Sequence, residues 1–398
     1  MTNVYAALEI GTSHTVLAIG EEDAGGRLNV FCHARIPSTG VRKSQILDLS
    51  QATQSVKSVL REIERNQQES GLSVSIGNAF LVVSGQHIQV EPYQGSAQVS
   101  GSKVASEDLE NVARSVRAMP IGRDRELLDI VERAYSLDDL SGISSPKGMA
   151  GRVLKLDTLQ IHADANRIND ARTAAGEAHL ELRDPLFAAT CAADAVLSEA
   201  DRRSGTLVLD LGGGSTGYAA YCDSYLAAAG VLGVGGDHIT NDIAHAFQTT
   251  NAQAEGLKIT EASAVIGRNG TGRVKIPGAT PLMEKRTISR HALDTVVNAR
   301  CREIAEMLRS ELEYHNLQNR LNGDIVLTGG GAAMNGFDEI LSRELAMNVR
   351  IGKPVNVDGF AGDKDATSYA AISGALLYAL RNYEEKGFFQ SIFGVFKK

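Results

Sequence analysis

The sequence predicts an α/β protein made of two homologous lobes, each built on a β-sheet with flanking helices. Three observations lead to this prediction. The chain has 398 residues, which is enough for about two or three domains with well-filled cores. A strand–turn–strand motif occurs twice, about half a chain apart, and a third glycine-rich segment follows an apolar strand in the second half.

The repeated motif reads ALEIGTSHTVLAI from Ala7 to Ile19 and VLDLGGGSTGYAA from Val208 to Ala220. In both copies an acid lies in an apolar strand, followed by a glycine turn and a second strand, as in a β-hairpin. A buried carboxylate needs a partner, and small turn residues let successive N–H groups point inward as a nest for phosphate. We therefore expect the hairpins to face each other across a polyphosphate, with Mg²⁺ near the acids Glu9 and Asp210. The alternative is two unrelated hairpins whose acids face solvent, which explains two copies in matching register less well.

A third glycine-rich segment follows the apolar strand expected at residues 324–328. This strand leads into Gly329–Gly331 and then into a helix expected at about residues 334–345. Such an arrangement lets the backbone lie close to a flat base or a ribose. Taken alone the signal is weak, because many glycine triplets are simple turns.

Another glycine-rich turn, at residues 233–236, precedes a helix that we expect to reach about residue 247, with Asp237 as its N-cap. On the next helix Glu255 and Lys258 are three residues apart and share one face. Two interpretations of this pair remain open. The residues bind the nucleoside, or they form an ordinary solvated salt bridge with each other.

Composition and charge exclude several classes of protein. The 40 basic and 48 acidic residues give a net charge of −8, which argues against nucleic acid as a main partner. Hydrophobic and charged fractions of 43% and 22% are those of an ordinary globular protein. The N-terminal segment lacks the pattern of a secretory signal, and no apolar run reaches the ~18 residues of a membrane span. The cysteines have no metal-ligand spacing, so we expect a reduced, cytoplasmic protein; they are Cys32, Cys191, Cys222 and Cys301.

Three segments, LEIGTSHT, LDLGGGST and LTGGGAAMNGF, resemble the two phosphate motifs and the adenosine motif of the actin-like ATPase superfamily, and the likeness extends over nearly the whole chain. The resemblance implies an actin-like ATPase fold that binds ATP with Mg²⁺ between its lobes, with Asp210 and Glu9 holding the metal through water. The nucleotide-binding residues that it implies are Gly11, Thr12, Ser13, His14, Gly212, Gly213, Gly214, Ser215, Thr216, Gly235, Gly236, Glu255, Lys258, Gly329, Gly330 and Gly331. No residue is assigned a catalytic role, since a turn histidine such as His14 is more often exposed than catalytic.

Further segments resemble the FtsA family of bacterial cell-division proteins, which are actin homologues. They are PSTGVRK at 37–43, FLVVSGQHI at 80–88 and GISSPKGMAG at 142–151, the last within a family-specific subdomain called 1C. The division that this implies is: 1–85, subdomain 1A; 86–162, subdomain 1C; 163–203, subdomain 1A continued; 204–235, subdomain 2A; 236–322, subdomain 2B; 323–365, subdomain 2A continued; 366–382, a helix returning to 1A; 383–386, a short linker; and 387–398, an amphipathic helix.

The terminal segment, GFFQSIFGVFKK, is expected to bind a membrane surface. At ~100° per residue its large apolar side chains fall on one arc and its polar residues on the other. The alternative is a helix that packs on the protein's own core. FtsA proteins end in such a targeting helix, although the family usually places a longer linker before it. The expected membrane-binding residues are Phe388, Phe389, Ile392, Phe393, Val395, Phe396, Lys397 and Lys398.

Resemblance to FtsA implies filaments on the inner face of the cell membrane at the division site, and recruitment of later division proteins. It also implies docking of the FtsZ C-terminal peptide on subdomain 2B, where Arg300 and Glu303 are the candidate residues. Related chaperone ATPases carry an acid where this chain has Ala188, so we expect slow ATP hydrolysis at most. Two alternatives remain: a PilM-type pilus-assembly scaffold, and a sugar-kinase-like or exopolyphosphatase-like enzyme.

Overall fold

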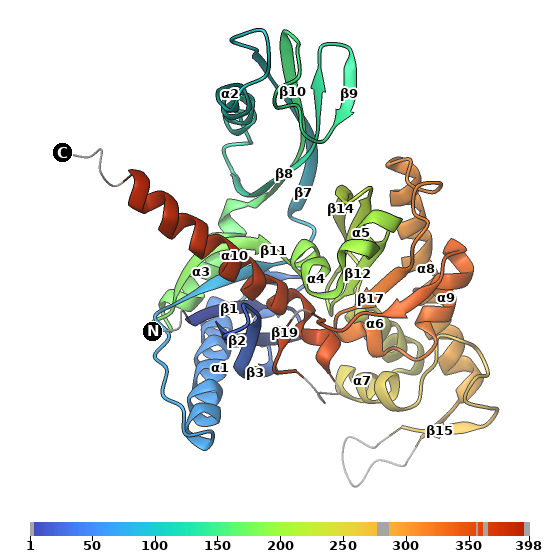
Figure 1. Cartoon of the computed structure of the whole chain (residues 1–398). Helices are drawn as coiled ribbons and strands as arrows, with labels where there is room; N and C mark the ends of the chain where they lie inside the picture. Colours follow the sequence, from blue (N-terminus) through green and yellow to red (C-terminus); the bar gives the residue numbers. More distant parts are fainter. Residues whose placement is uncertain (1–3, 277–285, 356, 361–364, 394–398) are drawn as a thin grey trace.

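The computed structural model describes the backbone of residues 4–276, 286–355, 357–360 and 365–393, and side chains as far as residue 382. Two sheet-based lobes lie side by side, and a smaller subdomain stands above them (Figure 1). None of the helices in this part of the chain combines the length and the apolar character needed to cross a bilayer. All four cysteines are buried and free.

The first lobe is built on a six-stranded sheet in the order β11-β6-β1-β2-β3-β19. Its sheet is covered on both faces: Leu8 and Leu17 pack against the α1 and α3 side, whereas Ala7 and Val16 pack toward α4 and α10. This alternation follows from the two-residue period of a strand. The strands are β1 Val4–Ile10, β2 His14–Glu22, β3 Leu28–Pro37, β6 Asn78–Val83, β11 Glu181–Phe187 and β19 Val357–Asp358, and the helices are α1 Leu49–Glu69, α3 Ala165–Gly176, α4 Ala188–Val196 and α10 Ala370–Phe393.

The second lobe repeats this arrangement in a five-stranded sheet, β14-β13-β12-β17-β18. As β1 is antiparallel to β2 and parallel to β6, so β12 is antiparallel to β13 and parallel to β17. The predicted pair of homologous lobes is therefore confirmed. The strands are β12 Leu207–Leu211, β13 Thr216–Cys222, β14 Tyr225–Leu232, β17 Ile325–Thr328 and β18 Val349–Ile351, and the helices are α5 Glu199–Ser204, α6 Gly236–Phe247, α7 Asn251–Thr260, α8 Arg290–Tyr314 and α9 Phe337–Leu345.

The subdomain above the lobes is an antiparallel sheet, β7-β10-β8-β9, with α2 packed on β7 and β10. A separate small core of valines and leucines, including Val112 and Leu154, holds α2 to the sheet. Its elements are β7 Ile88–Gln98, α2 Ser106–Arg117, β8 Arg125–Leu137, β9 Leu140–Ile143 and β10 Val153–Asp164. The remaining short elements of the chain are β4 Val41–Arg42, β5 Gln45–Ile46, β15 Arg273–Lys275, β16 Thr287–Ser289, η1 Gly330–Ala333 and η2 Ala366–Tyr369.

Two elements differ from the expected division of the chain. β19 lies within 323–365, the range expected in the second lobe, yet it pairs with β3 of the first lobe. The backbone of α10 also continues through 383–386, the expected linker, because Glu384, Glu385 and Lys386 are good helix formers and nothing there interrupts the helix. The membrane-binding residues expected at 388–398 lie outside the described side chains, and 394–398 lie outside the described backbone.

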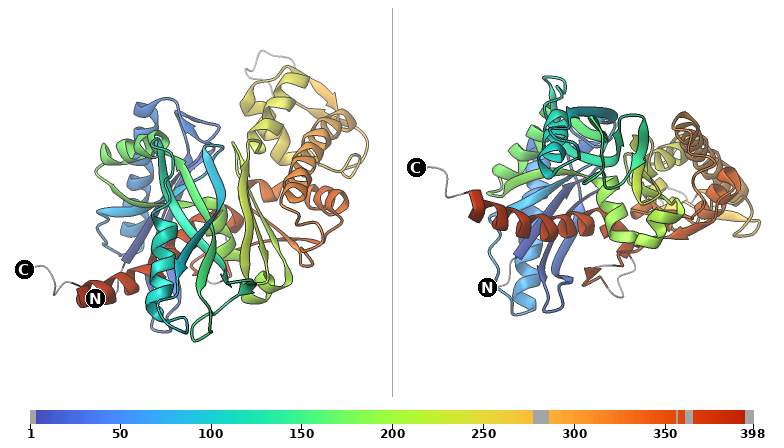
Figure 2. Two further views of the ribbon diagram at one scale, coloured as in Figure 1. Left: turned by 90° about the horizontal axis from the view of Figure 1, so that it is seen from above. Right: turned by 45° about the horizontal axis from the view of Figure 1, so that its top comes forward.

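α4 and α10 form the joint between the lobes. α4 packs against β12 and β13 of the second lobe, and α10 packs against α4 and against β1, β2 and β6 of the first. The two helices cross closely at Gly374, where a Cβ atom would overlap the backbone carbonyl of Cys191. The C-terminal part of α10 then extends beyond the first lobe in both views of Figure 2.

Candidate functional site

The two repeated hairpins have the same hydrogen-bonding register. Ile10 lies opposite Thr15 in the first hairpin, and Leu211 lies opposite Thr216 in the second, 201 residues later. Each loop is closed by one backbone bond of 3.0 Å, from the N–H of Gly11 to the carbonyl of His14 and from Gly212 to Ser215. The sequence repeat is thus a repeat of backbone geometry.

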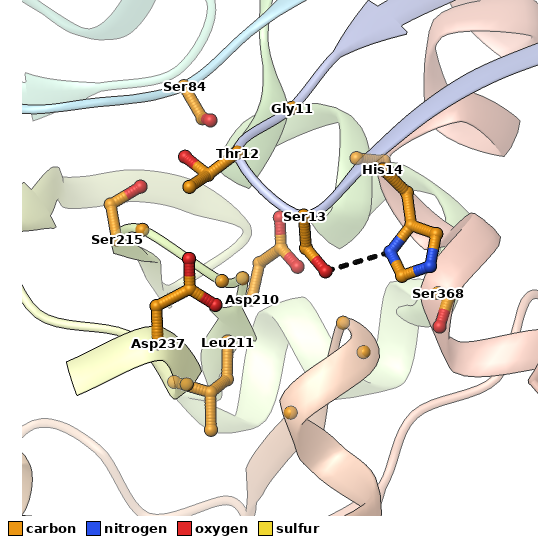
Figure 3. A pocket seen from close by; sticks show the side chains of 18 of the residues that line it. Gly11, Thr12, Ser13, His14, Ser84, Asp210, Leu211, Ser215, Asp237 and Ser368 are labelled. Atoms are coloured by element: carbon orange, nitrogen blue, oxygen red, sulfur yellow. Dashed lines mark hydrogen bonds between the residues drawn. The ribbon is translucent and has the colours of Figure 1, made fainter. Parts of the chain in front are cut away.

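The loops of these hairpins face each other across a cleft of about 500 Å³, a volume typical of sites for small ligands and cofactors. In Figure 3 Thr12 from the first loop and Ser215 from the second lie near each other, with Asp210 and Asp237 beside them. Most of the residues predicted to bind a nucleotide line this cleft. They are Gly11, Thr12, Ser13, His14, Gly212, Gly213, Gly214, Ser215, Gly236, Glu255, Lys258, Gly329, Gly330 and Gly331, together with the predicted metal residues Glu9 and Asp210.

Two predicted residues do not line the cleft, and they support it from behind. Thr216 is buried and donates its hydroxyl hydrogen to the carbonyl of Val234 at 2.7 Å. Gly235 packs against the second loop so closely that a Cβ atom would come within 2.6 Å of the carbonyls of Gly212 and Gly213. The two residues hold the second loop against the start of α6.

Glu9 and Asp210 approach each other from the two strands that precede the loops. Burial, and then the neighbouring carboxylate of Asp210, raise the pKa of Glu9 to about 8, although the charge of Arg35 acts in the opposite direction. Burial also raises the pKa of Asp210, to about 6. Two neighbouring buried carboxyl groups fit a cation between them, and Mg²⁺ commonly uses one or two carboxylates with water and phosphate oxygens as its other ligands. Among the described side chains, no three acidic, His or Cys residues form a complete metal cage.

His14 is a neutral member of the first loop. Arg35 donates to its Nδ1 at 3.1 Å, and Ser13 lies 2.9 Å from the same atom (dashed in Figure 3). Since a guanidinium can only donate, Nδ1 carries no hydrogen. Burial, and then the charge of Arg35, lower the pKa of His14 to about 4. Arg35 also contacts Asp365 at 3.2 Å, which joins β3 to the segment before α10.

α6 and α7 form the wall of the cleft in the second lobe. Lys258 contacts Glu255 at 2.7 Å and donates to the carbonyl of Gly236 at 3.2 Å and to the hydroxyl of Thr240 at 2.9 Å. The two residues form the salt bridge of one interpretation, and both line the cleft, so that binding of a nucleoside by this pair stays a prediction. The N-cap of α6 is Gly235 and not the expected Asp237, which lies in the first turn with its carboxylate toward the second loop.

Gly329–Gly331 form the turn after β17. Gly329 has φ +81°, and a Cβ atom there would overlap Asp210, so glycine is required. The residues that follow form a 3₁₀ turn at Gly330–Ala333, and α9 begins at Phe337 and not near Met334 as expected. The reason is Gly336, whose φ of +79° interrupts the helical backbone.

Several residues that line the cleft were not predicted from the sequence. Ser84 follows β6, and its position beyond the carboxyl end of a parallel strand was the available signal. Ser44 lies in the short β4–β5 hairpin, and Arg35 and Asp365 are 330 residues apart. No local pattern marks these three, since only the folded chain brings them to the cleft. Ala188 does line the cleft, at the first residue of α4.

Arg300 and Glu303, the predicted partner-binding residues, lie outside the cleft on α8. Arg300 makes two bonds to the carboxylate of Asp242 on α6, at 2.7 and 3.0 Å, and a further ion pair with Glu303. The guanidinium therefore joins α6 to α8 while its side chain stays about one-fifth exposed.

Comparison with known proteins agrees with this geometry. A structure of a PilM–PilN type IV pilus biogenesis complex is 19% identical and covers 94% of this chain and 98% of that chain, with a TM-score of 0.65. MreB5 of Spiroplasma citri bound to ADP is 13% identical and covers 96% of this chain and 98% of that chain, with a TM-score of 0.52. The arrangement of the two lobes and the cleft between their loops is that of the actin-like ATPase fold.

Sequence similarity identifies a particular family within this fold class. The family model "Cell division protein FtsA" matches residues 207–374, and "SHS2 domain inserted in FTSA" matches residues 85–162. The FtsA protein of Pseudomonas aeruginosa is 30% identical over 385 residues, 96% of this chain and 90% of the relative. That of Escherichia coli is 28% identical over 390 residues, 96% of this chain and 91% of the relative. The chain belongs to the FtsA family of cell division proteins.

Proposed function

We propose that this chain is an ATP-binding, actin-like cell-division protein that polymerises at the inner face of the cell membrane, tethers FtsZ filaments there and recruits later division proteins. One observation carries the nucleotide part of the proposal. The loops after Glu9 and Asp210 have the same register and face each other across one cleft. MreB5, which shares the fold, has been solved with ADP and with AMPPNP.

In this proposal the triphosphate lies between the loops, and Mg²⁺ neutralises its charge beside Asp210 and Glu9. Backbone N–H groups of the glycine-rich turns donate to the phosphates. Glu255 and Lys258 of α7 and the backbone at Gly329–Gly331 enclose the nucleoside, since all of them line the same cleft.

ATP binding is testable with Gly214→Ala. A Cβ atom at Gly214 would overlap the Thr12 hydroxyl and come within 3.0 Å of Lys43, so it fills the space between the loops. The control is Gly176→Ala, because a Cβ atom at Gly176 meets nothing within 4 Å. In a titration with ATP and Mg²⁺, we expect the wild type and the control to bind. The affinity of Gly214→Ala should be at least about tenfold weaker, which corresponds to a loss of ~1.4 kcal/mol of binding free energy. A wild-type chain that binds no nucleotide would refute the proposal.

Hydrolysis is expected to be slow. A group that positions the attacking water is needed for fast turnover, and the cleft presents the methyl group of Ala188 where related chaperone ATPases carry an acid. ATP then acts mainly as a ligand that stabilises the polymer-competent state. Steady-state phosphate release above about 1 s⁻¹ would contradict this expectation.

Membrane attachment is proposed from the sequence of residues 387–398. A short apolar face gains on the order of several kcal/mol in the headgroup layer, and ordering the helix offsets much of this gain. Attachment by one helix is thus weak, and many helices aligned in a filament bind by avidity. Membrane attachment and polymerisation are therefore coupled.

Liposome co-sedimentation tests the attachment. We expect the double variant Phe389→Asp, Phe393→Asp to stay in the supernatant while the wild type sediments with vesicles. Ser391→Asp is a matched control because it adds a charge on the polar arc of the same segment. Equal sedimentation of all three would remove the membrane part of the proposal and favour a PilM-type scaffold.

A further inference from the structure

The β4–β5 hairpin is a small element at the entrance to the cleft. Its two turn residues, Lys43 and Ser44, both have left-handed backbone, with φ of +50° and +57°. This is the geometry of a type I′ turn, which residues other than glycine, asparagine and aspartate adopt infrequently. The surrounding contacts hold the turn in this conformation and place Ser44 in the lining of the cleft.

Ser44 touches both phosphate loops at once. Its backbone N–H donates to the hydroxyl oxygen of Thr12 in the first loop at 2.7 Å. Its own hydroxyl lies 3.2 Å from that of Ser215 in the second loop. Gly214 leaves room for this contact, since a Cβ atom there would come within 3.1 Å of the Ser44 nitrogen. The hairpin therefore joins the two lobes at the tips of the loops.

Ser44 also touches the segment that leads into the inserted subdomain. Residues 84–87 connect β6 to β7, and Ser84 of this connector lines the cleft. Gly85 has φ +120°, and a Cβ atom there would lie 2.7 Å from the Cβ of Ser44. The next residue, Gln86, packs against Gly233 of the second lobe, where a Cβ atom would overlap its amide.

The connector is itself tied to the base of the inserted subdomain. Arg125, at the start of β8, donates to the carbonyl of His87 at 2.9 Å and to Nδ1 of His162 on β10 at 2.9 Å. A displacement of the connector is thus passed to three strands of the subdomain. Packed interiors transmit small shifts. The contacts of Ser44 therefore connect the loop tips to this subdomain through the connector.

We propose that Ser44 is a positioning residue that detects the terminal phosphate of a nucleoside triphosphate and relays its presence to the inserted subdomain. The proposal rests on the nucleotide-binding function proposed above. A phosphate oxygen between the loop tips accepts the hydrogen of the Ser44 hydroxyl in place of the neutral pair with Ser215, because a charged acceptor makes the stronger bond. The turn shifts with its hydroxyl and moves Gly85, and a diphosphate, which lacks the terminal group, leaves the pair with Ser215 in place.

Hydrogen–deuterium exchange of the full chain, with Mg-ATP, with Mg-ADP and without nucleotide, tests the relay. In the wild type we expect slower exchange in residues 84–98 with ATP than with ADP. Ser44→Ala and Ser44→Gly are expected to keep ATP affinity within about tenfold, the loss typical of one neutral hydrogen bond, and to lose the difference between ATP and ADP. The glycine variant suits the left-handed backbone at this position and retains the N–H that binds Thr12. Ser50→Ala, on the exposed start of α1, is the control.

Each outcome is decisive. If the Ser44 variants keep the wild-type difference between ATP and ADP, or if the wild type binds ATP without any such difference, the relay is refuted while nucleotide binding stands. If the wild type binds no nucleotide in a direct titration, the proposed function fails and the relay fails with it. Loss of the difference in both Ser44 variants, with the control unchanged, supports the relay.

Discussion

The crossing of α4 and α10 predicts that replacing glycine by alanine has opposite effects on stability at two positions. Gly374 and Gly256 both lie inside α-helices, where replacing glycine by alanine gains up to about 1 kcal/mol from backbone entropy. At Gly256, which is exposed on α7, an added Cβ meets nothing within 4 Å. Gly256→Ala is therefore expected to stabilise the protein by about 0.5–1 kcal/mol.

At Gly374 the added methyl group would overlap the Cys191 carbonyl, which is part of the α4 backbone and cannot move aside as a flexible side chain can. Forcing the helices apart costs about 3 kcal/mol or somewhat more, the upper part of the range for overpacked cores. After the helix gain is subtracted, Gly374→Ala is expected to destabilise the protein by about 2 kcal/mol.

Denaturant unfolding followed by far-UV circular dichroism measures both variants against the wild type. The expected separation between them is about 3 kcal/mol, which lies well outside the error of such a measurement. Because α4 packs on the second lobe and α10 on the first, we also expect weaker ATP binding in Gly374→Ala than in Gly256→Ala. A Gly374→Ala variant as stable as Gly256→Ala would show that the two helices do not cross at this point and would refute the reasoning.

Three other predictions concern single side chains. Lys258→Met removes contacts to Glu255, Gly236 and Thr240, and we expect ATP affinity to fall by about tenfold in a fluorescence titration; an unchanged affinity would place the nucleoside elsewhere. The pKa of His14 is lowered to about 4 in the folded chain, so the unfolded chain binds a proton first, and stability is lost as the pH falls from about 6.5 toward 4. His14→Gln should flatten that part of the stability profile, and a profile of unchanged slope would mean that His14 is charged. Arg300→Glu places an acid beside Asp242 and Glu303, and we expect it to weaken binding of an FtsZ C-terminal peptide in an anisotropy assay, whereas equal binding would move the docking surface away from α8.

The repeated hairpins show how far local sequence can predict this site. Glu9 and Asp210 are recognisable because each lies in an apolar strand, two residues before the first glycine of a turn. The residues that favour such a turn are all within a few positions of each other. The structure places both acids in the cleft. Thr216 belongs to the second motif and Gly235 to the turn before α6, yet neither lines the cleft, because the register of β13 and the cap of α6 decide where they lie.

The boundaries of elements were less predictable than their existence. α9 begins three residues later than its apolar pattern indicates, because the positive φ of Gly336 is a property of the turn and not of that pattern. β19 joins the sheet of the first lobe, although the strand before it, β18, belongs to the second. The pairing partner of a two-residue strand depends on which edge is open, and no short window of sequence contains that information.

Fold class, lobe repeat and the position of the two glycine-rich loops follow from residues that are neighbours along the chain, since strands, turns and caps are decided by nearby side chains. The meeting of Ser44 with Thr12, Ser215 and Gly85, the pairing of Arg35 with Asp365 and the crossing of α4 with α10 at Gly374 come from the folded state alone. Each of these contacts joins segments separated by tens to hundreds of residues. Their geometry is decided by the packing of elements that lie far apart in the sequence, and burial of apolar surface alone favours compactness without specifying partners.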